Sequence, residues 1–560
     1  MPRPSSTGAP PAPAVTAFDM AARQRDISIS EFFLKNRHLL GFDTPAKALL
    51  TAVKEAVDNA IDACEEAGIL PEISVEISRR GRIYTVAVED NGPGIVEAQI
   101  GRIFGKLLYG SKFHKLSQSR GQQGMGISAA GMYGQLTTGK PLHILSRIAG
   151  EAQATELYVA IDTKKNRPDV HRKKQRDWDR PHGTRVEIVL EGHYQTGKHS
   201  VDAYLRQTAI ANPHVALHLR ATEGHRLDFP RSIDALPPRP KEIKPHPHGL
   251  ELGRLIQMLS TTEARSLSRF LVEEFSSVGD KTAARIIEAA GKRVSARSYP
   301  RHIAHAQAVA LHRAIQDTPV AAPRTDCIVP IGEAQLLKGL QSEVPAEFYT
   351  VTTRPAATYR GNPFQVEVAL AYGRPGEARV EVDASGHMRR TQAQRRGEDL
   401  LGERDAPVHL LRYANRVPLL YQQSSCAITK AVIQTNWRGY GLRQPKGGLP
   451  TGPVAVLVHV ASVWVPYTSE AKEAIEPNPD IFKEIVLGLQ HCGRELSRHL
   501  RRKAQLSHEY ERRAYIERYL PHIGGALQEI LSLSDAERDR AMERLDDVLH
   551  ESRRTRGNAR

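Results

Sequence analysis

Around residue 55 the hydrophobic positions follow a helical period and the polar positions gather on the opposite face. Glu55, Asn59 and Asp62 stand at i, i+4 and i+7, so a helix stacks them in one row. The apolar stripe consists of Leu49, Leu50, Val53, Ala56, Val57 and Ala60. Asn and Asp are indifferent helix formers, so the row is either a solvated helix face or a surface that binds something.

Alternating hydrophobic and polar residues next predict strands, and an earlier helical segment covers 29–42. The predicted strands lie at 73–79, 83–89, 142–148, 155–161 and 184–192. A helical start followed by several strands predicts an α/β sandwich that ends near residue 230.

Beyond it, helical patterns, strands and again helices follow one another. A proline-rich stretch is followed by helices that the turn "SSVGDKT" interrupts, then by strands at 363–373, 378–386 and 452–467, and the tail is helical from about residue 480. We therefore expect an α+β multidomain protein. The expected divisions are a disordered arm (1–20), the sandwich (21–235), a linker (236–249), a helical domain (250–315), a second α/β domain (316–480) and a helical C-terminal region (481–560).

Composition adds a charge argument. The 560 residues are 40% hydrophobic and carry a formal net charge of +15, with a pI of about 9.6. Nucleic acid is the commonest partner of so basic a protein, although a basic surface alone gives the same totals. Four dispersed cysteines without a C-x-x-C pair argue against zinc and disulfides. No segment reaches a membrane-spanning length, so we expect a cytoplasmic protein without a membrane partner, nucleoid-associated in a prokaryote.

Two loops carry candidate chemistry. In "EDNGPGI" (89–95), a rigid turn fixes the Asp90 carboxylate, which can accept a hydrogen bond from an exocyclic amine such as that of adenine; the same letters also describe an ordinary turn. In "SRGQQGMGISAAGMYGQ" (119–135), glycines precede a helix start, a pattern that lets backbone N–H groups approach phosphates. This loop is neither a Walker A motif nor a convincing Rossmann fingerprint.

Taken together, the acid/Asn helix, the D-x-G-x-G turn, the glycine loop and "GTRVEI" (183–188) occur in the order found in GHKL ATPases, the group of gyrase B, Hsp90, MutL and sensor histidine kinases. A finer resemblance is to the B subunit of DNA topoisomerase VI. It rests on the segments 29–71, "LLYGSKF", 119–135 and "YTSEAKEAI", and it covers nearly the whole chain. It implies a GHKL (Bergerat) ATPase sandwich, a helix-two-turns-helix insert, a transducer domain and C-terminal helices that dock the partner A subunit.

The resemblance also implies roles for single residues. Glu55 is the expected general base for ATP hydrolysis, Asn59 the Mg²⁺ ligand, Asp90 the reader of the adenine amine and Gly94 the pocket floor; Asp62 is expected to be structural. The remaining expected nucleotide contacts are Ser111, Lys112, Gly121, Gln122, Gln123, Gly124, Met125, Gly126, Ile127, Ser128 and Thr184. For Lys112 an ordinary surface lysine is the alternative.

In the second α/β domain, Lys472 of "YTSEAKEAI" is by resemblance the switch lysine that contacts the γ-phosphate, with Lys446 as its rival. The stretch 434–444 matches the family's W-K-x-Y pattern except that Arg438 replaces the lysine, which puts any contact expected of a lysine there in doubt. Trp437 and Tyr440 fit a core role equally well.

The implied function is that of the ATP- and Mg²⁺-dependent part of a topoisomerase. Two copies would dimerise on ATP binding, capture a second DNA duplex and drive strand passage by the A subunit in an A2B2 heterotetramer, relaxing and decatenating DNA. Strand cleavage belongs to the A subunit. Basic clusters at 387–399 and 497–505 are ordinarily solvated faces; the first is also a candidate for contact with the DNA backbone, whereas the C-terminal helices that carry the second are expected to dock the A subunit. The alternatives are another GHKL machine, MutL-like or Hsp90-like, and a non-catalytic DNA-binding homologue.

Overall fold

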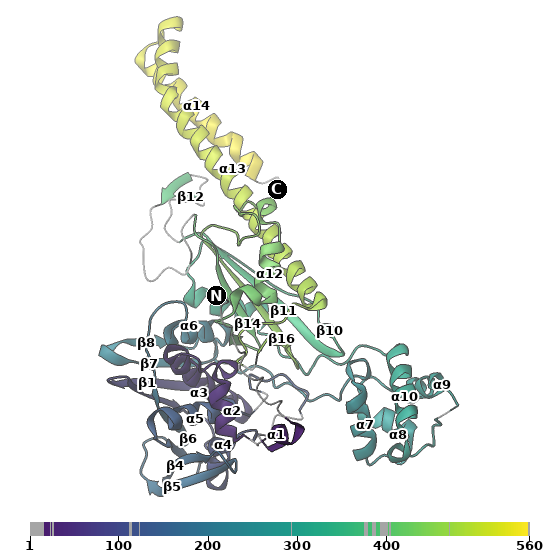
Figure 1. Ribbon diagram of the computed structural model, residues 1–560. Helices are drawn as coiled ribbons and strands as arrows, with labels where there is room; N and C mark the ends of the chain where they lie inside the picture. The colour runs from purple at the N-terminus through teal and green to yellow at the C-terminus, as the bar shows by residue number, and fades with distance from the viewer. Residues whose placement is uncertain are drawn as a thin grey trace, which may run out of the picture.

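The computed structural model describes residues 16–22, 24, 27–110, 115–121, 124–292, 294–374, 379–382, 388–391, 401, 405–469 and 471–557. Within them the predicted fold class is confirmed: an α/β sandwich, a helical module, a second α/β unit and C-terminal helices follow in order (Figure 1). No helix in these ranges combines the length and apolar character that crossing a membrane requires.

The N-terminal unit is built on an eight-stranded sheet of order β5-β4-β3-β6-β2-β1-β7-β8. Its strands are β1 (Glu72–Arg80), β2 (Ile83–Asp90), β3 (Leu142–Arg147), β4 (Ala154–Asp162), β5 (Arg167–Arg176), β6 (Gly183–Glu191), β7 (Ala216–Arg220) and β8 (Arg226–Phe229). Its helices are α1 (Ala17–Ala22), α2 (Ile29–Lys35), η1 (Arg37–Leu40), α3 (Pro45–Ala67), α4 (Glu97–Gly105), α5 (Gly126–Thr138), α6 (Val201–Ala211) and η2 (Thr222–Gly224).

Helix α3 begins and ends on local signals. The Thr44 hydroxyl accepts a hydrogen bond from Lys47 N, Pro45 occupies the first turn, and Gly68 ends the helix in the left-handed region at φ +77°. The predicted apolar stripe packs on the sheet, with Leu49, Val53 and Val57 at most 1% exposed. The polar row is therefore directed along the edge of this core.

A four-helix module stands to one side of the rest (Figure 1). It consists of α7 (Leu252–Thr261), α8 (Leu267–Glu274), α9 (Asp280–Ala289) and α10 (His305–Asp317), with the short turns η3 (Pro247–Gly249) and η4 (Pro300–His302). Its own core includes Phe270 and Phe275, whose rings meet edge to face at 5.6 Å. Its separate core explains why the helical pattern was readable from local sequence.

The second α/β unit has a six-stranded sheet of order β10-β11-β16-β14-β15, with β9 also paired to β11. Its elements are α11 (Glu333–Glu343), β9 (Phe348–Thr353), β10 (Ala357–Tyr359), β11 (Asn362–Tyr372), β14 (His409–Ala414), β15 (Val417–Pro418), η5 (Gln423–Ser425), α12 (Ala427–Gln434), η6 (Trp437–Tyr440) and β16 (Val454–Ser462), and β12 (Arg379–Val382) pairs with β13 (Met388–Thr391). Strand β16 lies within the predicted strand segment 452–467 and is buried at every position.

Both faces of this second sheet are covered. Val366 and Val368 pack with α12 and α13 (Pro479–Leu531), while the alternate residues Ala369 and Ala371 pack with α11 and with α6 of the first unit. Helices α6 and α11 approach so closely that a Cβ at Gly339 would lie 2.1 Å from Ile210 O. The two units therefore share a core through α6, which fixes the position of that helix against the second sheet.

The C-terminal helices form a long projection (Figure 1). Helix α13 is capped by Asn478 and its first turns bury Ile481, Ile485 and Leu489 in the second unit. Helix α14 (Asp535–Gly557) then packs along α13.

Candidate functional site

A cavity of about 570 Å³ lies where α3, the end of β2, the glycine loop and the loop after β16 meet. A volume of this size is typical of small-molecule sites, roughly 300–1,000 Å³. The predicted site residues that line it are Glu55, Asn59, Asp90, Gly94, Gly121, Gly124, Met125, Gly126, Ile127, Thr184 and Lys472. The structure thus brings together residues from both ends of the sequence, from α3 to the loop after β16.

Asp90 is the buried polar group at one end of the cavity. It ends β2, is 7% exposed, and its Oδ1 accepts hydrogen bonds from Gly92 N (2.8 Å) and Thr184 N (3.2 Å). Burial raises its pKa to about 6, although the two backbone donors oppose this shift. A carboxyl group has a second oxygen, which can accept from a donor such as an exocyclic amine.

Two glycines permit the close packing around Asp90. A Cβ at Gly94, which has φ +74°, would lie 2.1 Å from Arg147 O, and a Cβ at Gly183 would lie 2.2 Å from Asp90 O. Only glycine fits such backbone approaches. The D-x-G-x-G turn is therefore shaped by contact with β3 and β6, which the local sequence did not reveal.

Glu55 and Asn59 face the glycine loop. A Cβ at Gly126 would lie 1.7 Å from Glu55 Oε2, and one at Gly121 would lie 3.8 Å from Asn59 Oδ1. Gly126 begins α5, and no side chain among the described residues caps that helix start. A carboxylate, an amide oxygen and a helix N-terminus consequently meet at one end of the cavity, an arrangement suited to phosphates and a divalent cation.

Ser111, Lys112, Gln122 and Gln123 lie outside the described residues. Ser128 is described and points away from the cavity: it is 1% exposed, and its hydroxyl donates to Ile103 O and Lys106 O, both at 3.2 Å. In this structure Ser128 holds α4 against α5.

Lys472 reaches the cavity from the second unit. It has φ +53°, and its ammonium donates to the main-chain oxygen of Arg120 at 2.9 Å. The loop is held on α3 by two further contacts, Lys54 Nζ to Ala471 O (3.4 Å) and the Lys47–Glu473 ion pair (2.5 Å). By contrast, Lys446 is exposed and is not among the described residues that line the cavity.

A second polar group lies behind the polar row. Burial raises the pKa of Asp58 to about 6, and its Oδ1 accepts a hydrogen bond from the Tyr204 hydroxyl at 2.8 Å. Burial lowers the pKa of Lys54, one turn before Asp58. These groups connect α3 with α6 and with the Lys472 loop.

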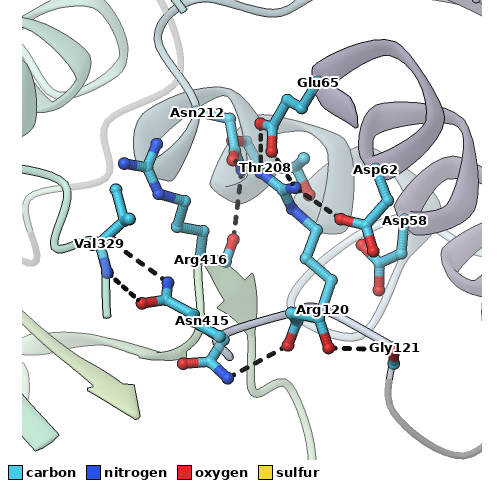
Figure 2. Close-up of polar contacts among 12 residues, drawn as sticks. Asp58, Asp62, Glu65, Arg120, Gly121, Thr208, Asn212, Val329, Asn415 and Arg416 are labelled. Atoms are coloured by element: carbon cyan, nitrogen blue, oxygen red, sulfur yellow. Dashed lines mark hydrogen bonds and ion pairs between the residues drawn. The ribbon is translucent and has the colours of Figure 1, made fainter. Parts of the chain in front are cut away.

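Arg120 is a residue that sequence patterns alone do not single out. Its guanidinium lies in a buried cluster with Asp62, Glu65 and Asn212 (Figure 2). The expected structural role of Asp62 agrees with its ion pair to Arg120 at 2.8 Å. The available signal was a pair of acids spaced i, i+3 on α3, which requires a nearby cation when buried.

The aromatic pair of the 434–444 stretch proves to be partly core. Trp437 is fully buried and donates from Nε1 to Val432 O at 2.8 Å, with Tyr440 edge-on to it at 6.3 Å. Arg438 is exposed and donates to Gln444 O. The first basic cluster, 387–399, lies largely outside the described residues.

Comparison with known proteins identifies these domains. A family model described as "Topoisomerase VI B subunit, transducer" matches residues 323–512, and one described as "Histidine kinase-, DNA gyrase B-, and HSP90-like ATPase" matches residues 44–191. The chain is 45% identical over 535 residues to the B subunit of type 2 DNA topoisomerase 6 from Archaeoglobus fulgidus, covering 95% of this chain and 84% of that protein.

A second relative, the B subunit of type 2 DNA topoisomerase 6 from Methanococcoides burtonii, is 45% identical over 520 residues, which is 92% of this chain and 79% of that protein. The similarity extends over nearly the whole chain, as the resemblance predicted. The chain therefore belongs to the family of type 2 DNA topoisomerase 6 B subunits and contains its GHKL-type ATPase and transducer domains.

Proposed function

We propose that this chain is the ATP-driven clamp of a topoisomerase VI assembly. Two copies join through their ATPase domains when ATP binds, capture a second DNA duplex, and pass this closure through the transducers to a DNA-cleaving A subunit in an A2B2 complex. One observation carries the proposal: the cavity combines Glu55, Asn59 and Asp90 of the ATPase domain with Lys472 of the transducer. Because a nucleotide in this cavity contacts both domains, a change in the nucleotide shifts the equilibrium between relative positions of the two domains.

Each residue has a proposed role in hydrolysis. The Glu55 carboxylate accepts a proton from the attacking water, Asp90 accepts the hydrogen bond of the adenine amine, and Lys472 contacts the γ-phosphate. Phosphoryl transfer depends mainly on positioning and charge neutralisation, so one well-placed carboxylate suffices as base. The Asn59 amide oxygen supplies a hard ligand for Mg²⁺, which, when bound, neutralises phosphate charge.

The proposed domain limits follow the same assignment. They are an arm at 1–20, the ATPase domain at 21–235, a linker at 236–249, a helix-two-turns-helix domain at 250–315, the transducer at 316–480 and a region at 481–560 that docks the A subunit. The last assignment is supported by large hydrophobic side chains exposed on α13, among them Tyr515, Ile523 and Ile530.

Binding to DNA is proposed from charge. The net charge of +15 favours contact with phosphate backbones, and the cluster 497–505 leaves Arg498 with 70% of its side chain exposed on α13. Such binding is weakened by salt because it depends on counterion release. We expect the isolated chain to bind DNA without cutting it; a covalent adduct formed between the pure chain and DNA would contradict this division of labour.

Glu55→Gln tests the proposed function. The variant keeps the shape of the side chain, so binding of a non-hydrolysable ATP analogue and nucleotide-dependent dimerisation should survive while kcat falls by at least about 100-fold. Glu66→Gln is the matched control, since Glu66 is exposed on the same helix and does not line the cavity. Strand passage with the A subunit should be lost only in Glu55→Gln. Unchanged hydrolysis in Glu55→Gln would refute the assigned role.

A further inference from the structure

Arg120 lies at the start of the glycine loop, directly before Gly121, and is almost fully buried, with 5% of its surface exposed. Its guanidinium donates to Asp62 Oδ1 (2.8 Å), to both Glu65 oxygens (2.7 Å each) and to Asn212 Oδ1 (2.6 Å). Figure 2 shows these acceptors converging from α3 and from the C-terminus of α6. The planar fork of Arg matches this set of acceptors, which a lysine ammonium cannot reproduce.

Further ionisable groups lie at this buried cluster. Asp62 and Glu65 face Arg120, and a second buried guanidinium, that of Arg416, is 4% exposed and donates to Pro330 O at 3.0 Å. Burial opposes ionisation of Glu65, but the charge of Arg120 lowers the pKa of Glu65 well below its usual range. Burial lowers the pKa of Arg416 to about 10. Asp62 and Glu65 both pair with Arg120, and His214 Nε2 lies 2.7 Å from Glu65 Oε1, so removing Arg120 leaves buried carboxylates without their partner.

The segment around Arg120 is bound to the transducer at three successive residues, by the side chain of Gln118 and by the main-chain oxygens of Ser119 and Arg120. Gln118 exchanges side-chain hydrogen bonds with the backbone of Val329 (2.6 and 3.1 Å). Ser119 O accepts a hydrogen bond from Asn415 Nδ2 at 3.1 Å, and Arg120 O accepts one from Lys472 Nζ at 2.9 Å. The segment that leads into Gly121 is therefore held by three separate parts of the transducer.

The Asn415–Arg416 turn is itself joined firmly to the transducer sheet. It connects the antiparallel strands β14 and β15 with both residues at positive φ, +48° and +67°. Asn415 exchanges hydrogen bonds with the backbone of Ser462 at 2.9 Å each, and Arg416 N donates to the fully buried His459 at 3.0 Å. Because Ser462 and His459 belong to β16, a displacement of this turn is a displacement of the sheet centre.

Asn212 joins the guanidinium of Arg120 to the main chain of Arg416. It is fully buried, its Oδ1 accepts from Arg120 and its Nδ2 donates to Arg416 O at 3.2 Å. We propose that Arg120 is a positioning residue that couples the glycine loop to the transducer turn Asn415–Arg416, through Asn212 and through the main chain of the preceding residue, Ser119. This inference rests on the nucleotide site assigned under the proposed function.

The experiment measures whether nucleotide state still moves the transducer. The cysteines Cys64, Cys327, Cys426 and Cys492 are all buried. Arg172 on β5 and Glu509 on α13 are exposed. In a chain with both Arg172→Cys and Glu509→Cys, a dye pair therefore labels the two introduced thiols in preference to the buried native cysteines. Energy transfer is recorded with ADP and with a non-hydrolysable ATP analogue in the full chain, in Arg120→Lys and in Asn415→Ala. ADP affinity, KM and kcat are measured in parallel.

We expect both variants to keep ADP affinity and KM within about threefold of the parent, while the analogue-dependent distance change falls by more than half and kcat by about tenfold. The double variant should add little to either single one, because both break the same connection. The matched control is Arg185→Lys, another arginine bound by several carboxylates (Glu76, Glu89 and Glu187) and placed on β6 of the ATPase sheet; it should behave like the parent.

Two results would overturn the inference, and they are distinguishable. A parent chain that shows no analogue-dependent distance change would defeat the ATP-driven closure of the proposed function and the inference with it. A parent that changes, with Arg120→Lys and Asn415→Ala changing equally and keeping parental kcat, would defeat the inference alone and leave Arg120 as core packing. If Arg120→Lys does not fold, Asn415→Ala, which removes no buried charge, decides.

Discussion

Gly126 lies so close to Glu55 that a Cβ on the glycine would stand 1.7 Å from the carboxylate oxygen Oε2. The start of α5 therefore determines where the proposed base is held. Gly126→Ala should displace the Glu55 side chain and lower kcat by at least about tenfold, since small misplacements of a catalytic group are costly. Ala is a better helix former than Gly, so instability of α5 is not the expected cause.

Gly253→Ala is the control for this substitution. Gly253 lies in α7, where an added Cβ meets no described atom within 4 Å, so kcat should be unchanged. Steady-state ATP hydrolysis and thermal unfolding of both variants provide the check. Parental kcat in Gly126→Ala would show that Glu55 is free to adopt another productive position.

Lys472 and Lys446 can be separated by alanine substitution. Lys472 lines the cavity, whereas Lys446 is exposed on the transducer. Lys472→Ala should leave ADP affinity within about threefold of the parent while reducing hydrolysis by at least about tenfold, because the lost contact is to the γ-phosphate. Lys446→Ala should hydrolyse ATP normally. The reverse outcome, with loss only in Lys446→Ala, would show that the wrong lysine has been assigned.

Asp90 predicts a pH dependence of nucleotide binding. Burial raises its pKa to about 6, so the carboxyl becomes neutral as the pH falls through that value. A neutral carboxyl accepts the adenine amine less well, and ADP affinity should fall by up to about tenfold between pH 7 and pH 5. Titration calorimetry of the parent and of Asp90→Asn isolates this effect, because ADP itself titrates identically with both. An equal pH dependence in the two proteins would refute it.

His143 predicts a pH dependence of stability. Burial alone lowers its pKa, but hydrogen bonds to Glu187 (2.7 Å) and Glu156 (2.9 Å) raise it overall. The same bond to His143 lowers the pKa of Glu187 to about 2. The raised pKa of His143 adds to the free energy of unfolding fully below the pKa of an unfolded histidine, and this contribution is lost as the pH rises through the folded pKa. The lowered pKa of Glu187 adds to the free energy of unfolding fully above the pKa of an unfolded glutamate, and this contribution is lost as the pH falls through the folded pKa. Their pairing is therefore strongest between about pH 4.5 and pH 6.5.

His143→Gln should consequently lower the unfolding temperature of the ATPase domain by about 2 °C more at pH 5.5 than at pH 8.5. His171→Gln is the control, since the His171 side chain is 52% exposed and stands 3.6 Å from Asp169. Differential scanning calorimetry at the two pH values distinguishes them. A constant difference between parent and His143→Gln across this range would contradict the assigned ion pairs.

Local pattern predicted the elements that carry a clear apolar signal, either a one-sided stripe or a continuous buried run. The stripe Val53, Ala56, Val57 and Ala60 is buried as expected, and β1, β2 and β16 occupy the predicted segments. Strand β5 escapes prediction because it lies at the edge of the sheet with most of its side chains exposed, so hydrophobic alternation does not mark it.

The candidate site likewise contains residues that local sequence motifs predicted and residues that they did not. Glu55, Asn59 and Asp90 stood out because their neighbours in sequence form recognisable motifs, and Lys472 came from family resemblance alone. Arg120 could not be predicted because its acceptors come from α3 and from the end of α6, and its main chain is bound by a transducer residue 352 positions later. Such pairings are set by the fold and leave no local period in the sequence.

Helix α13 is long enough for a small tilt at one end to become a large displacement at the other. Its 53 residues make a rod of about 80 Å, and only its first turns are embedded in the sheet's core. Tilting the embedded end by about 5° would carry the far end through about 7 Å, a distance of about two base-pair steps of DNA. A nucleotide-dependent tilt of the transducer would therefore be enlarged along α13 into a displacement on the scale of the double helix.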